Sequence, residues 1–212
     1  MKTYTIKSQK DLDKHKDENG YNIKGNAEFE YSADFTGRLL VDGSLSIEAG
    51  GDIQAGGDIE AGEYIKAVGS IKASGYIEAG GFIKAGWFIK AGEYIEAGGY
   101  IEAGGFIKAG LYIKGGGSIE AGWDIEAGGD IEAGGYIQAG LYIKAGGYIE
   151  AGGVYGIRAE LSITCKGTLS FGLSAYAGIC TWKEATEEDK TITCSKLLKG
   201  NIEYGVLVET VN

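Results

Sequence analysis

Glutamate side chains recur at fixed intervals through the centre of this chain, and paired carboxylates are the residues here that could perform acid–base chemistry. Enzymes that cleave polysaccharides use two carboxylates, one of them held in a recessed pocket that raises its pKa. These glutamates follow isoleucines in a regular column that we expect to face solvent, where no such pocket forms. The spacing therefore does not predict a glycosidase or a lyase.

Histidine and cysteine offer no other route to catalysis. His15 is the only histidine and lies in a polar stretch, so no base accompanies a nucleophile. Cys165, Cys180 and Cys194 lack the close spacing of zinc ligands. Three cysteines cannot all pair, so reduced thiols are the simplest interpretation, with one disulfide and a leftover thiol as the alternative. The glycines form no phosphate-binding or dinucleotide-binding motif. We expect no enzyme, and no catalytic residue, metal or cofactor.

Composition and charge narrow the class of partner. The chain has 212 residues and a formal net charge of -10, whereas binding to nucleic-acid phosphates needs clustered lysine and arginine. No apolar run approaches the ~18 residues of a membrane span, and the polar N-terminus is not a signal peptide. We expect a cytoplasmic protein of a bacterial or phage-infected cell that contacts neither nucleic acid nor membrane.

A six-residue repeat organises the centre of the chain. Isoleucine occupies position 47 and every sixth position to 149, eighteen times, in units that read G-(Y/F/D/S)-I-(E/K/Q)-A-G. The phase also runs backward, so we place the start of the repeat near Tyr21, which gives 22 hexads up to residue 152. The earlier apolar residues in this phase are Val41, Phe35, Phe29 and Ile23.

A period of six fits neither a helical face nor a hairpin meander, but it fits a short strand followed by a glycine corner. Alternate residues of a strand point to opposite sides, so each isoleucine and the alanine two residues later share the interior. Three hexads close a triangular coil, and successive coils stack their strands in register. The sequence therefore predicts an all-β fold, a single-stranded triangular parallel β-helix (solenoid). Dividing 22 hexads by three gives about seven coils.

The repeat over residues 21–152 resembles the hexapeptide-repeat left-handed β-helices and, in its G-x-I-x-A-G cadence, the bactofilin-like polymer-forming proteins. It departs from the acyltransferases of the hexapeptide family, because no loop with a catalytic histidine interrupts it. The resemblance implies a fold and not an activity. The handedness of the helix stays open.

The two ends differ from the repeat. Residues 1–20 predict a polar N-terminal arm or cap, and residues 153–212 predict further strands and a small C-terminal β cap. A stack of strands has open ends that template polymerisation unless they are covered, and we expect the C-terminal module to cover one of them.

The residues that follow isoleucine separate by charge when they are sorted at intervals of 18. One face becomes acidic and its neighbour mostly basic, although like charges stacked at strand spacing repel. The pattern is compatible with a solvated surface or with a binding face. The acidic column consists of Glu60, Glu78, Glu96, Glu132 and Glu150.

The residues that precede isoleucine also point outward, so the central coils should carry a belt of exposed aromatic side chains, with tryptophans replacing corner glycines. Stacked aromatics stabilise neighbouring strands by ~0.2–1 kcal/mol per pair. An exposed apolar patch also usually has a partner, and the sequence supports both interpretations. The predicted binding residues of the belt are Tyr76, Phe82, Trp87, Phe88, Tyr94, Tyr100, Phe106, Tyr112 and Trp123.

Three functions fit these features. The first is a non-catalytic rigid scaffold that binds a protein through the belt and the acidic face. In its sharper form it imitates nucleic acid and inhibits a nucleic-acid-binding protein such as a bacterial defence nuclease, as anti-CRISPR proteins do. The alternative is a self-assembling structural protein like the bactofilins it resembles, and the third is a carbohydrate-binding rod of the phage type.

Overall fold

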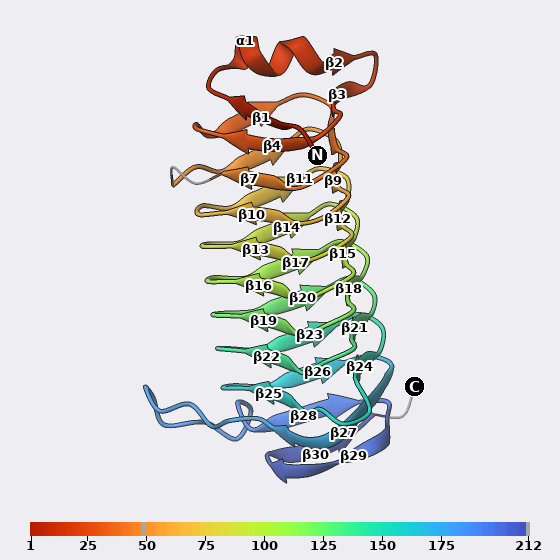
Figure 1. Ribbon diagram of the computed structural model, residues 1–212. Helices are drawn as coiled ribbons and strands as arrows, with labels where there is room; N and C mark the ends of the chain where they lie inside the picture. Colours follow the sequence, from red (N-terminus) through yellow and green to blue (C-terminus); the bar gives the residue numbers. More distant parts are fainter. Residues whose placement is uncertain (48–49, 211–212) are drawn as a thin grey trace.

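The chain winds into a parallel β-solenoid with three strands per coil (Figure 1). The structure is a computed structural model that describes residues 1–47 and 50–210. We number the three sides of the prism in the order in which the chain visits them. None of the helices in the described ranges is long and apolar enough to span a membrane.

Each face is a ladder of short parallel strands. Face 1 consists of β1 (Thr3–Ile6), β4 (Asn26–Phe29), β7 (Leu45–Ile47), β10 (Ile65–Ala67), β13 (Ile83–Ala85), β16 (Ile101–Ala103), β19 (Ile119–Ala121), β22 (Ile137–Ala139) and β25 (Ile157–Ala159). Face 2 consists of β5 (Ala33–Phe35), β8 (Ile53–Ala55), β11 (Ile71–Ala73), β14 (Ile89–Ala91), β17 (Ile107–Ala109), β20 (Ile125–Ala127), β23 (Ile143–Ala145), β26 (Ile163–Cys165), β28 (Thr191–Cys194) and β30 (Val206–Glu209). Face 3 consists of β3 (Gly20–Ile23), β6 (Arg38–Val41), β9 (Ile59–Ala61), β12 (Ile77–Ala79), β15 (Ile95–Ala97), β18 (Ile113–Gly115), β21 (Ile131–Ala133) and β24 (Ile149–Ala151).

Two longer strands, β27 (Thr168–Tyr176) and β29 (Lys196–Tyr204), run from face 3 round the corner onto face 1. Face 2 thus carries a sheet of ten strands, so the solenoid has about ten turns. The prediction of the all-β solenoid is confirmed, but the prediction of about seven coils is too low. The hexad count missed the coils at both ends, where the isoleucine repeat is absent.

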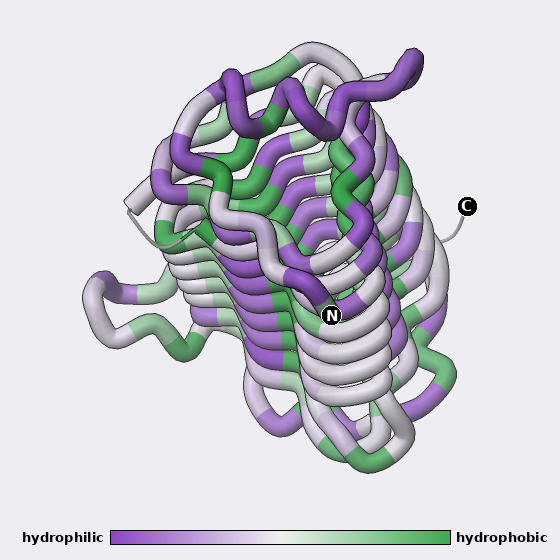
Figure 2. The backbone as a smooth tube through the Cα atoms, turned by 45° about the horizontal axis from the view of Figure 1, so that its top comes forward, coloured by the Kyte–Doolittle hydropathy of each residue, from purple (hydrophilic) through white to green (hydrophobic). Residues whose placement is uncertain are grey.

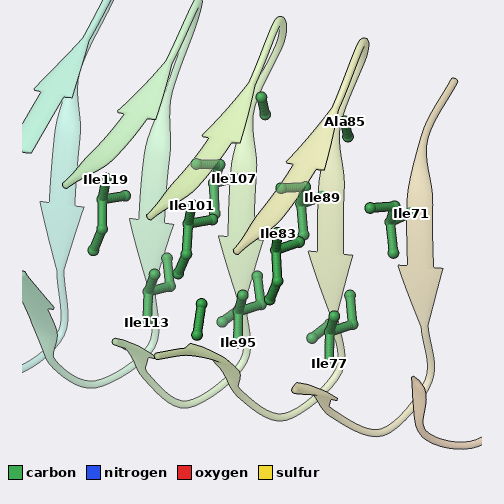
Figure 3. Close-up of a cluster of buried hydrophobic side chains, with 14 of the residues drawn as sticks. Ile71, Ile77, Ile83, Ala85, Ile89, Ile95, Ile101, Ile107, Ile113 and Ile119 are labelled. Carbon is green, nitrogen blue, oxygen red and sulfur yellow. The ribbon is translucent and has the colours of Figure 1, made fainter. Parts of the chain in front are cut away.

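Isoleucine and alanine line the interior along the whole length of the repeat. Ile77 pairs with Ile95 in the next coil and Ala79 with Ala97, an interval of three hexads, and all four side chains are buried. Figure 3 shows the isoleucines of the three faces converging on the axis in rows. In Figure 2, residues of similar hydropathy form columns along the prism, because equivalent positions of successive coils lie beside one another.

The first coils reverse the order of large and small interior residues. Leu45 pairs with Ile65, and Ile47 pairs with Ala67, so this step along the chain is longer by two than the three hexads of the regular coil. The two extra residues fall between Ile47 and Ile53, and they move Ile47 from the isoleucine position to the alanine position. The single phase predicted from Ile23 onward is therefore wrong. The apolar residues that precede Ile47 at intervals of six are also buried. They occupy the alanine position of the strand and not the isoleucine position, as Phe35 does opposite Ala55.

The two ends of the stack are built differently. At the N-terminal end, α1 (Gln9–Leu12), the 3₁₀ helix η1 (Asp13–His15) and the strand β2 (Lys16–Asp17), which pairs antiparallel with β3, lie over the first coil, with Leu12 fully buried (Figure 1). At the C-terminal end, all four residues of β30 are exposed, and no described strand pairs with its outer edge. The C-terminal strands therefore extend the stack as its last coil.

Corner glycines are required where a side chain would overlap the backbone of the preceding coil. A Cβ atom at Gly98 would overlap the carbonyl oxygen of Gly80, whereas a Cβ atom at Gly153 would meet only the Lys199 Nζ at 3.7 Å. We predict that Gly98→Ala destabilises the protein by about 1–3 kcal/mol because the coils must move apart. Chemical denaturation measures the change, with Gly153→Ala as the matched control. Equal stability of the two variants would contradict this account of the corner.

Candidate functional site

The aromatic residues that precede isoleucine form three axial columns. Their rings are stacked face to face between adjacent coils, with centroid distances of 4.8–4.9 Å and interplanar angles of 1–6°. Because each ring covers its neighbour, most of these side chains are half-buried and not exposed as predicted. The columns are Tyr64–Phe82–Tyr100 on face 1, Phe88–Phe106 on face 2 and Tyr76–Tyr94–Tyr112 on face 3.

Five tyrosine hydroxyl groups on faces 1 and 3 donate hydrogen bonds to glutamates of the preceding coil. In each pair the glutamate lies 16 residues before the tyrosine. The pairs are Tyr76–Glu60 at 3.3 Å, Tyr94–Glu78 at 3.2 Å, Tyr112–Glu96 at 3.0 Å, Tyr136–Glu120 at 2.8 Å and Tyr148–Glu132. The predicted aromatic belt and the predicted acidic column are therefore parts of one hydrogen-bonded surface.

The residue type 16 positions before an aromatic residue of the columns differs between tyrosine and phenylalanine. Each phenylalanine of the columns, which has no hydroxyl to donate, follows a lysine at this spacing; the pairs are Phe82 with Lys66, Phe88 with Lys72 and Phe106 with Lys90. Tyr100 is an exception, since it follows Lys84. The rule is visible in the sequence, but it gains meaning only when the coil length is known.

Burial and the glutamate partners keep the tyrosines protonated. Burial, followed by the charge of Glu60, raises the pKa of Tyr76 to about 12. Burial and the hydrogen bond to Glu96 likewise raise the pKa of Tyr112 to about 12, and the pKa of Tyr94 is also raised, first by burial. Phenol groups that stay neutral are suited to donating hydrogen bonds and not to general-base chemistry.

The acidic column lies on face 3, as the interval of 18 predicts. Glu60, Glu78 and Glu96 are adjacent in register, and Glu132 is adjacent to Glu150. Lys114 separates the two groups and approaches Glu132 at 3.8 Å. The carboxylates therefore form two short runs, and most of them already accept a tyrosine hydroxyl.

Five large apolar side chains, two of them tryptophans, replace corner residues on one edge, between faces 1 and 2. We call this edge the ridge; it consists of Val68, Trp87, Trp123, Leu141 and Leu161. Trp87 is 62% exposed, Trp123 is 49% exposed and Val68 is 46% exposed, whereas the two leucines are partly buried. A stack of short coils holds these side chains on a rigid line.

The longest loop, residues 178–190, leaves the solenoid at the C-terminal end of the ridge and projects from the left side of Figure 1. It carries Trp182, which is 58% exposed and whose Nε1 donates to Glu160 at 2.8 Å. Residue type alone singled out Trp87 and Trp123, but not their common edge. Their separation by six hexads, which equals two coils, was the available signal, whereas the position of Trp182 required the structure.

The charges that flank the two tryptophans of the ridge differ in sign. Lys84 and Lys90 lie three residues before and after Trp87, whereas Glu120 and Glu126 flank Trp123 in the same way. The ridge therefore offers two tryptophan anchors, one between lysines and one between glutamates.

One coil interrupts all three aromatic columns. Ser118, Asp124 and Asp130 stand where the neighbouring coils carry rings, and each accepts a hydrogen bond from the backbone N–H of the tyrosine one coil later, at 3.2, 3.4 and 2.9 Å. Each missing ring leaves a surface hollow. Their volumes are about 300 Å³ beside Ser118, 310 Å³ beside Asp124 and 230 Å³ beside Asp130.

No known protein family, curated protein or solved structure matches this chain. Its function must therefore be argued from its own surface.

The described residues contain no group of three His, Cys, Asp or Glu side chains placed to hold a metal ion. The three cysteines are free, so of the two interpretations the reduced one describes this structure. Cys165 and Cys194 occupy alanine positions of the interior, and burial raises the pKa of the Cys165 thiol to about 12. Such buried thiols are poor nucleophiles and serve as small apolar side chains.

The raised tyrosine pKa values predict an alkaline limit to stability. A phenol whose folded pKa exceeds its unfolded value of about 10 stabilises the fold below pH 10. That contribution is lost as the pH rises towards 12, because the unfolded chain releases the protons first. We expect the free energy of unfolding to fall between pH 10 and about 12, together with a late phase in the ultraviolet titration of tyrosine. Replacing Tyr76, Tyr94 and Tyr112 by Phe should reduce the late phase, to which Tyr31, Tyr136 and Tyr142 also contribute through their raised pKa values; an undiminished late phase would contradict the assignment.

Proposed function

We propose that this protein is a non-catalytic, rigid scaffold that binds a partner protein along the ridge. The observation that carries the proposal is the exposure of Trp87 and Trp123 on a single edge, two coils apart. Tryptophan is the residue type most often found as an energetic anchor of protein interfaces, and exposed apolar side chains on one edge favour a binding surface.

The charges beside the ridge support a protein partner in particular. The lysines near Trp87 and the glutamates near Trp123 would require a partner with an acidic and a basic region at matching positions. Such complementarity fixes the orientation of a complex more than its affinity. A nucleic acid offers negative charge alone and would be repelled by the glutamates near Trp123.

The acidic column supports the nucleic-acid-mimicking form of the proposal less strongly. Its carboxylates repeat at ~4.8 Å, shorter than the phosphate spacing along a nucleic-acid strand. Tyrosine hydroxyls already bind four of its members, and Lys114 interrupts it. Inhibition of a defence nuclease remains one specific form of the scaffold function, in which the carboxylates replace phosphates.

The ridge predicts that a captured partner depends on tryptophan. Affinity capture from bacterial lysate, with and without nuclease treatment, compares the wild-type protein with Trp87→Ser/Trp123→Ser. We expect the double variant to lose the partner, with at least about 100-fold weaker binding, since each central anchor contributes ≥ ~2 kcal/mol. Leu111→Ser is the matched control, because Leu111 is 54% exposed on a different edge. Retention by the double variant would rule out the ridge as the interface.

The mimicking form predicts a separate dependence on charge. Five substitutions of the acidic column by Gln, at positions 60, 78, 96, 132 and 150, should then abolish binding of a nucleic-acid-binding partner and its competition by DNA. If binding survives these changes and still requires Trp87 and Trp123, the scaffold function stands without the mimicry.

Self-assembly is the second candidate function, and the uncovered last coil favours it. Val206, Leu207 and Val208 of β30 are 50%, 36% and 40% exposed, beside a strand edge that no described strand covers. The carboxylate of Glu209 accepts the Leu197 N–H at 2.8 Å, which blocks only part of this open end. Residues 191–210 contain two lysines and two glutamates, so charge does not oppose contact between two such ends. An exposed apolar strand edge is a template for another strand, so two last coils can pair end to end. A bactofilin-like polymer would need a second contact as well, because α1 and β2 lie over the first coil.

Self-assembly predicts oligomers that depend on this edge. Sedimentation and electron microscopy should show concentration-dependent end-to-end dimers, which Val206→Lys/Val208→Lys abolishes while the melting temperature stays unchanged. Lysine on an edge strand opposes pairing because its charge would be buried. A wild-type protein that stays monomeric at high concentration would exclude this candidate.

A further inference from the structure

The aromatic column of face 1 is missing one ring. Phe82 stacks between Tyr64 and Tyr100 at 4.8 and 4.9 Å, but the next position is Ser118, with Tyr136 beyond it. The hollow of about 300 Å³ beside Ser118 is lined by Tyr100 on one side and Tyr136 on the other. A flat ring placed there would have a tyrosine on either side, Tyr100 and Tyr136, as Phe82 has Tyr64 and Tyr100 in the intact part of the column.

Glu102 lies where a phenol hydroxyl would be expected to bind. It precedes Ser118 by 16 residues, the separation that joins every hydrogen-bonded tyrosine and glutamate of the columns. Its Oε1 accepts from the Lys84 Nζ at 2.8 Å, and among the described residues no donor contacts its Oε2. The hollow therefore combines stacking surfaces with a free acceptor at the hydroxyl position.

The other two hollows of this coil lack that acceptor. The residues 16 positions before Asp124 and Asp130 are Lys108 and Lys114, which pair with Glu126 at 2.8 Å and with Glu132 at 3.8 Å. Neither lysine can accept a hydrogen bond. Of the three hollows, the one beside Ser118 matches a phenol.

We propose that the hollow beside Ser118 binds a tyrosine side chain presented by the partner protein. The proposal rests on the scaffold function above and names the chemistry of one anchor of the partner. The hollow and the ridge border the same face: Ser118 precedes β19 and Trp123 follows it in one coil, and Glu120 of that strand lines the hollow. A partner seated on Trp123 can therefore insert a ring between Tyr100 and Tyr136 and donate its hydroxyl to Glu102.

N-acetyl-tyrosinamide is the probe, and N-acetyl-phenylalaninamide is its matched analogue without the hydroxyl. Both are titrated into the full chain with labelled tyrosine, and the ring signals of Tyr100 and Tyr136 are followed by NMR. We expect saturable shifts at both rings with the tyrosine amide and about fivefold weaker binding of the phenylalanine amide, because one hydrogen bond is lost. Glu102→Gln should reduce this difference.

Ser118→Tyr tests the site by filling it from within. This variant should lose the probe and melt no lower than the wild-type protein, since its own ring restores the column. Asp130→Tyr is the control: it adds a tyrosine to the same coil on another face and should leave binding unchanged. Equal binding of the two amides, equal binding of methyl glucoside or guanidinium, binding that survives Ser118→Tyr, or no binding up to the solubility limit would each overturn the proposal.

Affinity capture with the Ser118→Tyr variant distinguishes failure of the tyrosine site from failure of the scaffold function. If Ser118→Tyr weakens capture as Trp87→Ser/Trp123→Ser does, both stand. If capture depends on the tryptophans but not on Ser118, the scaffold function stands and the tyrosine site falls. If capture does not depend on the tryptophans, the scaffold function falls, and the amide titration alone decides whether the hollow binds a phenol.

Discussion

Axial register is the constraint on which the rest of this structure depends. Each residue of the repeat lies beside its counterpart three hexads away, at the strand spacing of ~4.8 Å. A choice of side chain at one position is therefore also a choice of neighbour for two other coils. In the interior, isoleucine satisfies this condition because apolar isoleucine side chains pack against one another in every successive coil. Figure 3 shows the resulting buried rows.

The outer surface meets the same constraint by pairing unlike groups between neighbouring coils. Aromatic rings stack directly on rings, but a column of carboxylates would repel itself at this spacing. A tyrosine hydroxyl from the next coil reaches each of several glutamates, and lysines such as Lys84 and Lys108 reach glutamates one coil away. Features that resemble a binding belt and an acidic face in the sequence are thus largely satisfied within the molecule. The groups left over, on the ridge and beside Ser118, are the better candidates for recognition.

The six-residue periodicity predicted the fold because every hexad carries the same structural signal, a short strand followed by a glycine corner. The interior role of isoleucine, the three-sided coil and its length of three hexads all follow from alternation along a strand and from glycine corners. The count of coils failed where the repeat fades, because β28 and β30 have no hexad signature. The phase before Ile47 failed for a different reason: a corner with two extra residues keeps the six-residue count while it exchanges the two interior positions. The common edge of Trp87 and Trp123 could be read at the interval of 36, but the contact of Trp182 with Glu160 could not, since it depends on a loop without repeat.

The covered first coil and the open last coil give the molecule a direction that matches its synthesis. The ribosome releases the segment of α1 and β1 before β4, so a surface on which β4 can pair exists before the later coils are made. Each new coil then needs only its immediate predecessor as a template, because contacts in a solenoid join neighbouring coils. Such a chain can fold coil by coil during translation, and at each stage only the most recent coil has an unpaired strand edge.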